Sequence, residues 1–217
     1  MFARFNDWYL GIPPVTRTMI SVVIVTSTLC QIGVVSPAWL QLNWRMIAYE
    51  LELWRVVTTF LFVGPVGFEW ILSVGMFTQM SQSLETSLFT GRRGDYVFLI
   101  LYGISATLMA SLVLLRYADS SLHVPFLGPA LAFMLLYVWA YSNPLIKVNI
   151  MGIVPVHAPY LPWVLVGFSI MTHSSVHTQL LGIAIGHSFY FLEEVYPRIK
   201  GDKPLTPLRN FASPILT

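Results

Sequence analysis

Residues 97–115 read VFLILYGISATLMASLVLL, a stretch without a charged side chain that is long enough to cross a bilayer as one helix. The same bias runs through the chain. Of its 217 residues, 56% are hydrophobic and 10% are charged, and the mean hydropathy is +0.69. This composition lies outside that of soluble domains. The sequence therefore predicts an all-α integral membrane protein, and its net charge of +2 is too small for a nucleic-acid-binding surface.

Six apolar stretches are predicted to cross the membrane, separated by turns rich in proline, glycine and polar residues. They are Thr18–Val35, Phe68–Met80, Val97–Leu115, Val124–Tyr141, Tyr160–Thr172 and Val176–Leu192. The second and fifth are short, since about 13 helical residues rise only ~20 Å and the hydrocarbon core is roughly 30 Å thick. We therefore expect these two helices to extend into polar flanks or the bilayer to be thin around them.

The segment Pro37–Arg55, between the first and second crossings, is predicted to lie in the plane of the membrane. It is rich in aromatic residues but carries four charged ones, which a spanning helix would have to place in hydrocarbon. Val56–Val63 then leads to the second crossing as a hinge or re-entrant segment. At the N-terminus, residues 1–14 place aromatic side chains at helical spacing, which indicates an interfacial helix. We expect a membrane domain over residues 1–196 and a short cytosolic tail over residues 197–217.

The distribution of basic residues predicts the orientation. Arg45, Arg55 and Arg116 lie on one side of this arrangement, and the other nine of the 12 basic residues lie on the side that carries both termini. By the positive-inside rule, both termini are predicted to be cytosolic.

Polar residues gather at the cytosolic end of the second crossing. Gln79 and Gln82 share a helical face and Ser83 follows directly. These side chains either bond to neighbouring helices, as is common in membranes, or line a wet groove that faces the cytosol. His187 in the sixth crossing fits the same two interpretations. Next to it, the spacing of Gly182 and Gly186 is typical of close helix packing.

Several motifs occur in an order and spacing that resembles the Derlin family over nearly the whole chain. They are Trp54-Arg55, the following Val56–Pro65, Leu84-Glu85, Gly91-Arg92, Tyr137–Trp139, Leu161–Leu165, Gly182–His187 and Phe191–Glu193. Derlins belong to the rhomboid superfamily, so the resemblance implies a rhomboid-like bundle of six helices with an in-plane loop between helices 1 and 2. In such folds the pair Trp54 and Arg55 is implied to fix that loop against the bundle, a role compatible with simple interfacial anchoring.

The resemblance also allows a comparison with rhomboid proteases. Their Gly-x-Ser-Gly motif is matched by Gly128-Pro129-Ala130-Leu131, so Ala130 occupies the nucleophile position. Aligning the glycines of the last helix places Gln179 at the position of the histidine. An alanine methyl group cannot attack a carbonyl, and a glutamine amide cannot act as a general base at neutral pH. The sequence therefore predicts a pseudoprotease without catalytic residues or a cofactor.

Two other candidate sites, a serine–histidine dyad and a zinc site, lie near the fifth and sixth crossings. Ser174 and Ser175 lie between His173 and His177, but residues this close in sequence rarely form a dyad and no carboxylate is nearby to orient a base. The two histidines could share a helical face and bind zinc, yet no third ligand follows at suitable spacing. An exposed loop is the favoured interpretation, and no metal site is expected.

The resemblance implies a protein of the endoplasmic reticulum membrane that helps to move misfolded polypeptides to the cytosol for degradation, a process linked to the unfolded protein response. The implied partners are misfolded clients, a membrane ubiquitin ligase complex, an AAA unfoldase and the lipid bilayer, with self-association left open. Many Derlins recruit the unfoldase through a glycine-rich motif in the tail. No such motif follows Pro197, so direct binding is not expected. A scaffold without a polypeptide path is the main alternative, and an intramembrane protease or a small-solute transporter fits less well.

Overall fold

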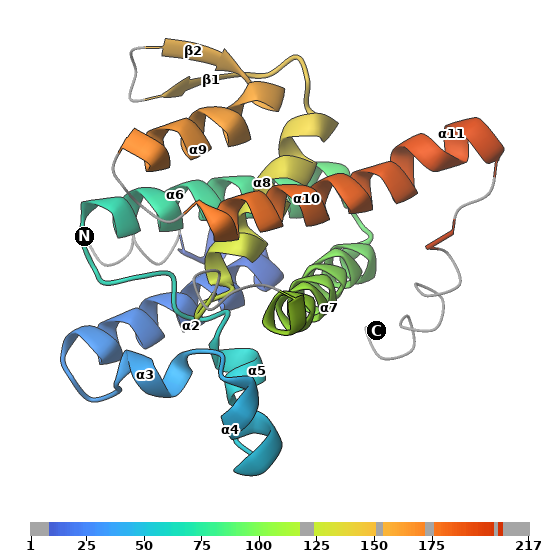
Figure 1. The fold of residues 1–217 in the computed structure, drawn as a ribbon. Helices are drawn as coiled ribbons and strands as arrows, with labels where there is room; N and C mark the ends of the chain where they lie inside the picture. The colour runs from blue at the N-terminus through green and yellow to red at the C-terminus, as the bar shows by residue number, and fades with distance from the viewer. Residues whose placement is uncertain (1–8, 118–123, 151–153, 172–175, 202–203, 206–217) are drawn as a thin grey trace.

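A computed structural model describes residues 9–117, 124–150, 154–171, 176–201 and 204–205, and its main elements are helices (Figure 1). A helix lies over each of the six stretches that the sequence predicts to cross the membrane. These helices are α2 (Pro14–Gln31), α6 (Phe68–Ser83), α7 (Arg93–Tyr117), α8 (Gly128–Ser142), α9 (Leu161–Met171) and α10 (His177–Tyr190). The predicted order of helices is therefore present in the structure.

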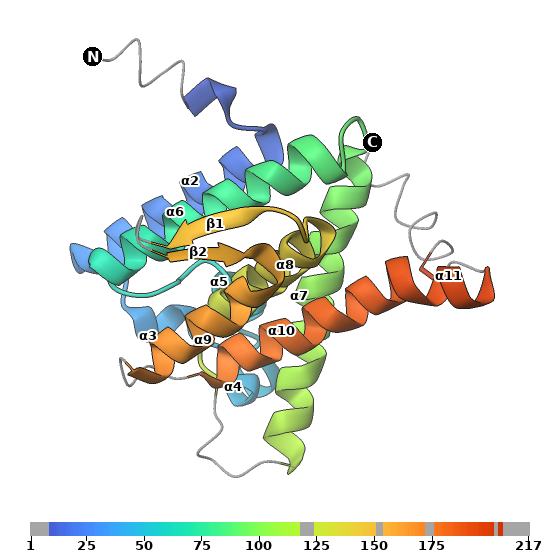
Figure 2. The ribbon, with the colours of Figure 1, turned by 90° about the horizontal axis from the view of Figure 1, so that it is seen from above.

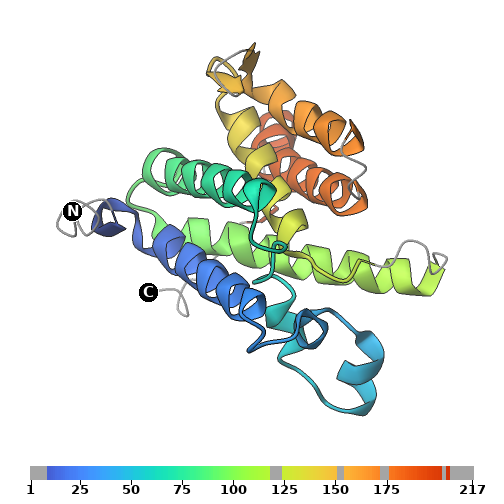
Figure 3. The same cartoon turned by 90° about the vertical axis from the view of Figure 1, so that its left-hand side faces the viewer.

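α7 is the longest helix and, among the described residues, the one long and apolar enough to cross a membrane by itself. Its segment Gly94–Arg116 has a mean hydropathy of 2.3, and only 28% of its most apolar part is buried inside the protein. Leu101, Met109 and Val113 point outward and are exposed. An outward-facing apolar surface of this kind is typical of contact with lipid. Figure 3 shows that α7 extends beyond α2 and α6 at one end.

The first helix begins and ends earlier than the predicted crossing Thr18–Val35. α2 begins at Pro14, with Pro13 as the preceding cap residue. Proline is well suited to the first position of a helix, which Pro14 occupies, because its fixed φ matches the helix and an N–H group there would have no partner within the helix. The chain then turns at Gly33, which has a φ of +78°. A positive φ is readily adopted by glycine and ends the helix before Val35.

Three short helices replace a crossing between α2 and α6. They are α3 (Pro37–Leu40), α4 (Trp44–Tyr49) and α5 (Arg55–Thr58), and they extend from one end of the bundle (Figures 1 and 3). Ser36 caps α3 by accepting a bond from the backbone of Ala38. Asn43 caps α4, since its side-chain oxygen accepts bonds from the N–H groups of Arg45 and Met46 at 3.1 and 3.3 Å. Each helix is far too short to span a bilayer.

α8 is the central helix of the bundle. Figure 2 shows it between α6 and α10, and it also contacts α7 and α9. Its side chains are buried around most of its circumference, including Ala130, Met134, Leu135 and Trp139. Because α8 is surrounded by other helices, it is apolar on all faces, although it is too short to cross a bilayer in contact with lipid.

Two strands form a hairpin that the all-α prediction omits. β1 (Lys147–Ile150) pairs antiparallel with β2 (Val154–His157), with Val148 opposite Val156. The hairpin joins α8 to α9 and lies at the end of the molecule opposite α3–α5 (Figure 1). Valine and isoleucine are enriched in strands, which explains its formation. Each strand is too short for its alternating pattern to be recognised in a sequence dominated by helical periodicity.

Short helical segments complete the described chain. η1 (Leu84–Leu88) is a π-helical continuation of α6, and η3 (Ala158–Tyr160) is a 3₁₀ turn before α9. η4 (Phe191–Val195) and α11 (Tyr196–Lys200) extend α10. The helix therefore continues past residue 196, where the membrane domain was predicted to end. Most of the predicted tail lies outside the described residues, as do residues 1–8 of the predicted interfacial helix.

Candidate functional site

The backbone is tightly packed around Ala130, the residue that the sequence predicts to match the protease nucleophile. Ala130 lies in the first turn of α8 and is completely buried. Its carbonyl oxygen faces Gly182 of α10, where an added Cβ atom would lie 2.2 Å away. Gly128 is just as confined, because its Cβ would lie 2.9 Å from the carbonyl oxygen of Phe60. The start of α8 is therefore packed against backbone on two sides.

Gln179 of α10, which the sequence predicts to match the protease base, is hydrogen-bonded to α9. Its Nε2 donates a hydrogen bond to Oγ of Ser169 in α9 at 2.7 Å. Its Oε1 is buried and has no hydrogen-bond partner among the described residues. The amide thus holds α10 against α9. Together, Ala130 and Gln179 offer neither a nucleophile nor a base.

Gly182 and Gly186 allow α10 to approach α8 closely, as the sequence suggests for this spacing. A Cβ at Gly186 would lie 2.9 Å from Cβ of Tyr137 and 3.0 Å from the carbonyl oxygen of Met134. The neighbouring His187 is exposed, and its Nδ1 lies 2.7 Å from the hydroxyl of Tyr137. His187 therefore bridges α10 and α8.

The residues of the predicted polar groove fall into two groups. Gln79 is exposed and Gln82 is half-buried, both near the end of α6. Ser83 accepts a hydrogen bond from Nε1 of Trp139 at 2.8 Å, which joins α6 to α8. His187 lies on α10, on the other side of α8 from α6 (Figure 2). The structure thus ties Ser83 and His187 into contacts between helices and leaves the two glutamines at the surface of α6.

A buried network at the same end of α6 was not assigned from the sequence. The carboxylate of Glu85 in η1 accepts bonds from the N–H and hydroxyl of Thr16 at 2.9 and 2.8 Å. Ser81 bonds to Thr16 at 2.9 Å and also to the hydroxyl of Tyr96 in α7. The only signal in the sequence is a glutamate within the motif Leu84-Glu85. Its partners come from distant segments that a pattern search does not connect.

Arg55 and Trp54 have different roles in the structure. Arg55 is 4% exposed, and its guanidinium donates to the carbonyl oxygens of Ala38 and Gln41 at 2.8 and 3.0 Å. It also pairs with the carboxylate of Glu52. Trp54 instead faces outward and is 53% exposed. A further contact from Arg55 to Sδ of Met46 at 3.3 Å reaches α4. Arg55 therefore ties α3 and α4 to α5, and the indole of Trp54 is free to settle at an interface.

The alternative nucleophiles and metal ligands can be placed only in part. His177 begins α10, whereas His173, Ser174 and Ser175 lie outside the described residues. Within the described ranges, no group of three His, Cys, Asp or Glu side chains is placed to hold a metal ion.

Comparison with known proteins places this chain in a family. A model of the Der1-like family matches residues 12–208. Derlin-2.1 of Zea mays is 36% identical over 210 residues, which cover 94% of this chain and 84% of the relative. Derlin-2.2 of Arabidopsis thaliana is 34% identical over 94% of this chain and 85% of its own length. A probable derlin-2 homolog of Dictyostelium discoideum is 36% identical over 94% and 80%, respectively.

These matches extend through the helices that hold Ala130, Gln179, Arg55 and Glu85. They agree with the outward-facing apolar surface of α7 in indicating a membrane protein. The chain belongs to the Der1-like family, the family of the Derlins.

Proposed function

We propose that this protein is a non-catalytic component of endoplasmic-reticulum-associated degradation that helps misfolded polypeptides to pass from the lumen or membrane to the cytosol. Membership of the Der1-like family supports a role related to this degradation. Ala130 and Gln179 support a contribution that involves no covalent chemistry. The protein would reside in the endoplasmic reticulum membrane in a rhomboid-like arrangement of six crossings, with both termini in the cytosol.

The shortness of α9 is the observation that carries this proposal. α9 has 11 residues, and the three-residue turn η3 precedes it. Together they span only ~23 Å, whereas the hydrocarbon core is roughly 30 Å thick. A bilayer that meets so short a helix is expected to thin around it.

A thinner membrane would help a polypeptide to cross. Each backbone amide that enters hydrocarbon without a hydrogen-bond partner costs several kcal/mol, so a shorter hydrocarbon path exposes fewer amides. Gln79 and Gln82 would offer polar partners at the end of α6, because Gln79 is exposed and Gln82 is half-buried. Ser83 and His187 are less suited to this role, since Trp139 and Tyr137 already bond to them.

The proposed partners follow from this role. Misfolded clients would contact the surface of α6, and the lipid around α9 is part of the mechanism. A membrane ubiquitin ligase complex and an AAA unfoldase would act on the client in the cytosol. Association between copies of the chain is compatible with the proposal but is not needed for it.

Site-specific crosslinking tests the proposal against a pure scaffold. A photoreactive amino acid would replace Gln79, and a matched control would replace Val25, which is exposed on α2. A misfolded lumenal client that is arrested during its passage should crosslink to position 79 and not to position 25. A client that crosslinks to neither position, while it still co-purifies with the protein, would favour the scaffold.

A further inference from the structure

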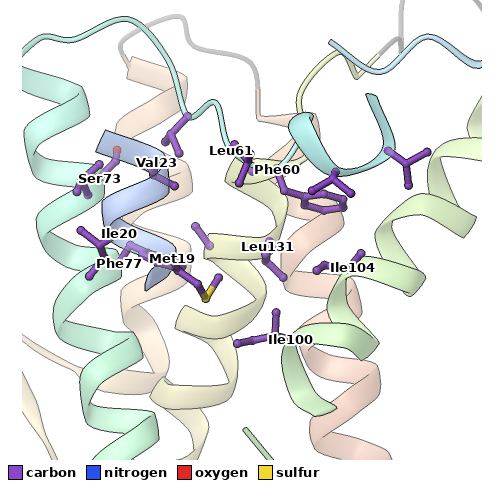
Figure 4. A pocket seen from close by; sticks show the side chains of 16 residues that line it. Met19, Ile20, Val23, Phe60, Leu61, Ser73, Phe77, Ile100, Ile104 and Leu131 are labelled. Atoms are coloured by element: carbon purple, nitrogen blue, oxygen red, sulfur yellow. The ribbon is translucent and has the colours of Figure 1, made fainter. Parts of the chain in front are cut away.

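A cavity of about 270 Å³ lies between α2, α6, α7 and α8, below the segment that follows α5 (Figure 4). α2 contributes Ile20 and Val23, α6 contributes Phe77, and α7 contributes Ile104. Of the 16 lining residues, Ser73 alone carries a polar side chain. None of the residues of the predicted groove lines it. The cavity is therefore a separate feature of the protein.

The helices on either side of the cavity are joined by hydrogen bonds at both of its ends. At one end, Thr16 of α2 bonds to Ser81 and Glu85. At the other end, Nε1 of Trp70 in α6 donates to Oγ of Ser27 in α2 at 3.0 Å. Between these contacts, the facing side chains are apolar and leave space. Because α2 and α6 are held in place at both ends, the cavity is a fixed part of the fold.

The chemistry of the wall selects an apolar ligand. A polar molecule would lose its hydrogen bonds to water and find one hydroxyl group in return, which is unfavourable by several kcal/mol. Apolar cavities of this kind stay dry and accept hydrocarbon ligands.

The wall of the cavity reaches the outer surface near α5. Val57 lines the cavity and is 62% exposed, and Ser73 also lines it and is exposed. Trp54 precedes Val57 by one helical turn, and its exposed indole is a group that settles at the level of lipid headgroups. A ligand that enters beside Val57 would thus have its polar end at the membrane surface.

We propose that this cavity binds the hydrocarbon tail of a membrane lipid, whose headgroup stays outside near α5. The volume suits part of one flexible chain, the wall is apolar except for Ser73, and lipid tails surround a protein of this family. The site fills the space between α2 and α6 and keeps their spacing. This inference does not depend on the proposed role in polypeptide transport.

A photoreactive lipid tests the proposal. The full-length protein is reconstituted into vesicles of phosphatidylcholine that carries a diazirine near the middle of one tail, and labelled residues are mapped by mass spectrometry after irradiation. Ile20 and Val23 are buried, so bulk lipid does not reach them, whereas Val25 on the same helix is exposed. We expect labels on Ile20 or Val23 as well as on Val25. Labels confined to outward-facing residues such as Val25 would overturn the proposal.

Variants that fill the cavity provide the matched comparison. Ala132 lines the cavity, whereas Ala184 is exposed on α10. Ala132→Phe should reduce labelling of Ile20 and Val23 several-fold, and Ala184→Phe should leave it unchanged. If Ala132→Phe does not fold, Ser73→Phe blocks the exposed mouth without disturbing the core and should have the same effect. Undiminished labelling of Ile20 and Val23 in a folded variant would contradict a lipid-tail site.

Discussion

Glu85 accepts two hydrogen bonds from Thr16, at 2.9 Å from the backbone N–H and at 2.8 Å from the hydroxyl, although 69 residues separate them. Its second carboxylate oxygen accepts from the N–H of Val15 at 3.2 Å. N–H groups in the first turn of a helix have no partner within the helix, and a negative charge there is favoured by the helix dipole. Glu85 therefore caps α2 from the end of α6 and fixes how the two helices meet.

Removal of this cap should lower the stability of the protein. Because a hydrogen bond to a charged group contributes about 2 kcal/mol, we expect Glu85→Ala to lower the midpoint of thermal unfolding in detergent clearly. Glu85→Gln should have a smaller effect, since its amide oxygen still accepts one bond. Glu194→Gln is the matched control, because Glu194 pairs with Arg198 at the exposed surface and such pairs contribute at most about 1 kcal/mol. Equal effects at both sites would exclude a capping role.

The contact between α8 and α10 should not tolerate a side chain at Gly182. The added methyl group of Gly182→Ala would meet the carbonyl oxygen of Ala130, and overpacking of this kind costs about 1–3 kcal/mol. We expect a lower unfolding midpoint and lower abundance in cells. Gly75→Ala in α6 is the control, because a Cβ there has no neighbour within 4 Å. That substitution should be neutral or stabilising, since alanine favours a helix over glycine by about 1 kcal/mol.

Arg55→Lys should loosen the segment α3–α5 and leave the rest of the bundle intact. A lysine ammonium cannot reproduce the fork that reaches Ala38, Gln41 and Glu52 at once. Loss of one such bond corresponds to roughly tenfold faster hydrogen exchange of the local amides, or about 1.4 kcal/mol. Hydrogen–deuterium exchange over residues 37–58 measures this change. Arg198→Lys at the exposed surface serves as the control. Unchanged exchange in Arg55→Lys would show that a lysine ammonium holds the segment α3–α5 as well as the guanidinium does.

The protein should not react as a serine hydrolase. We expect no labelling by a fluorescent fluorophosphonate, with an active rhomboid protease in the same detergent as the positive control. Ala130→Ser combined with Gln179→His should also remain unlabelled. The start of α8 is packed against Gly182 and Phe60, and the side chain at position 179 points toward Ser169 of α9. Labelling of the unaltered protein would contradict the non-catalytic account.

Local patterns predicted the helices but not their long-range contacts. The stretch Val97–Leu115 predicted α7 because an uncharged apolar run of that length has few other stable structures in a membrane. Pro37–Arg55 was predicted not to span because its charges would enter hydrocarbon, and it forms α3, α4 and the approach to α5. Helix ends were less accurate, since Pro13 and Gly33 determine them through backbone geometry and not through hydropathy.

Roles that depend on a partner from a distant segment could not be predicted. Ser83 looked available for a groove because Trp139, its hydrogen-bond donor, lies on another helix. Glu85 had no assigned role because four helices, α3 to α6, separate its segment from that of its partner Thr16 in the sequence. The cavity was likewise invisible, because its wall combines side chains from five parts of the chain whose spacing is set only by the folded bundle.

The turnover of a misfolded lumenal client in cells whose only Derlin carries Gln79→Leu and Gln82→Leu tests the central claim most directly. Abundance of the variant and its association with the ubiquitin ligase complex are measured in parallel, and Thr28→Leu on the exposed face of α2 is the matched control. We expect slower client degradation with normal abundance and normal ligase association, because crossing amides lose their polar partners. Normal client turnover at normal abundance would contradict a path along α6 and favour a scaffold.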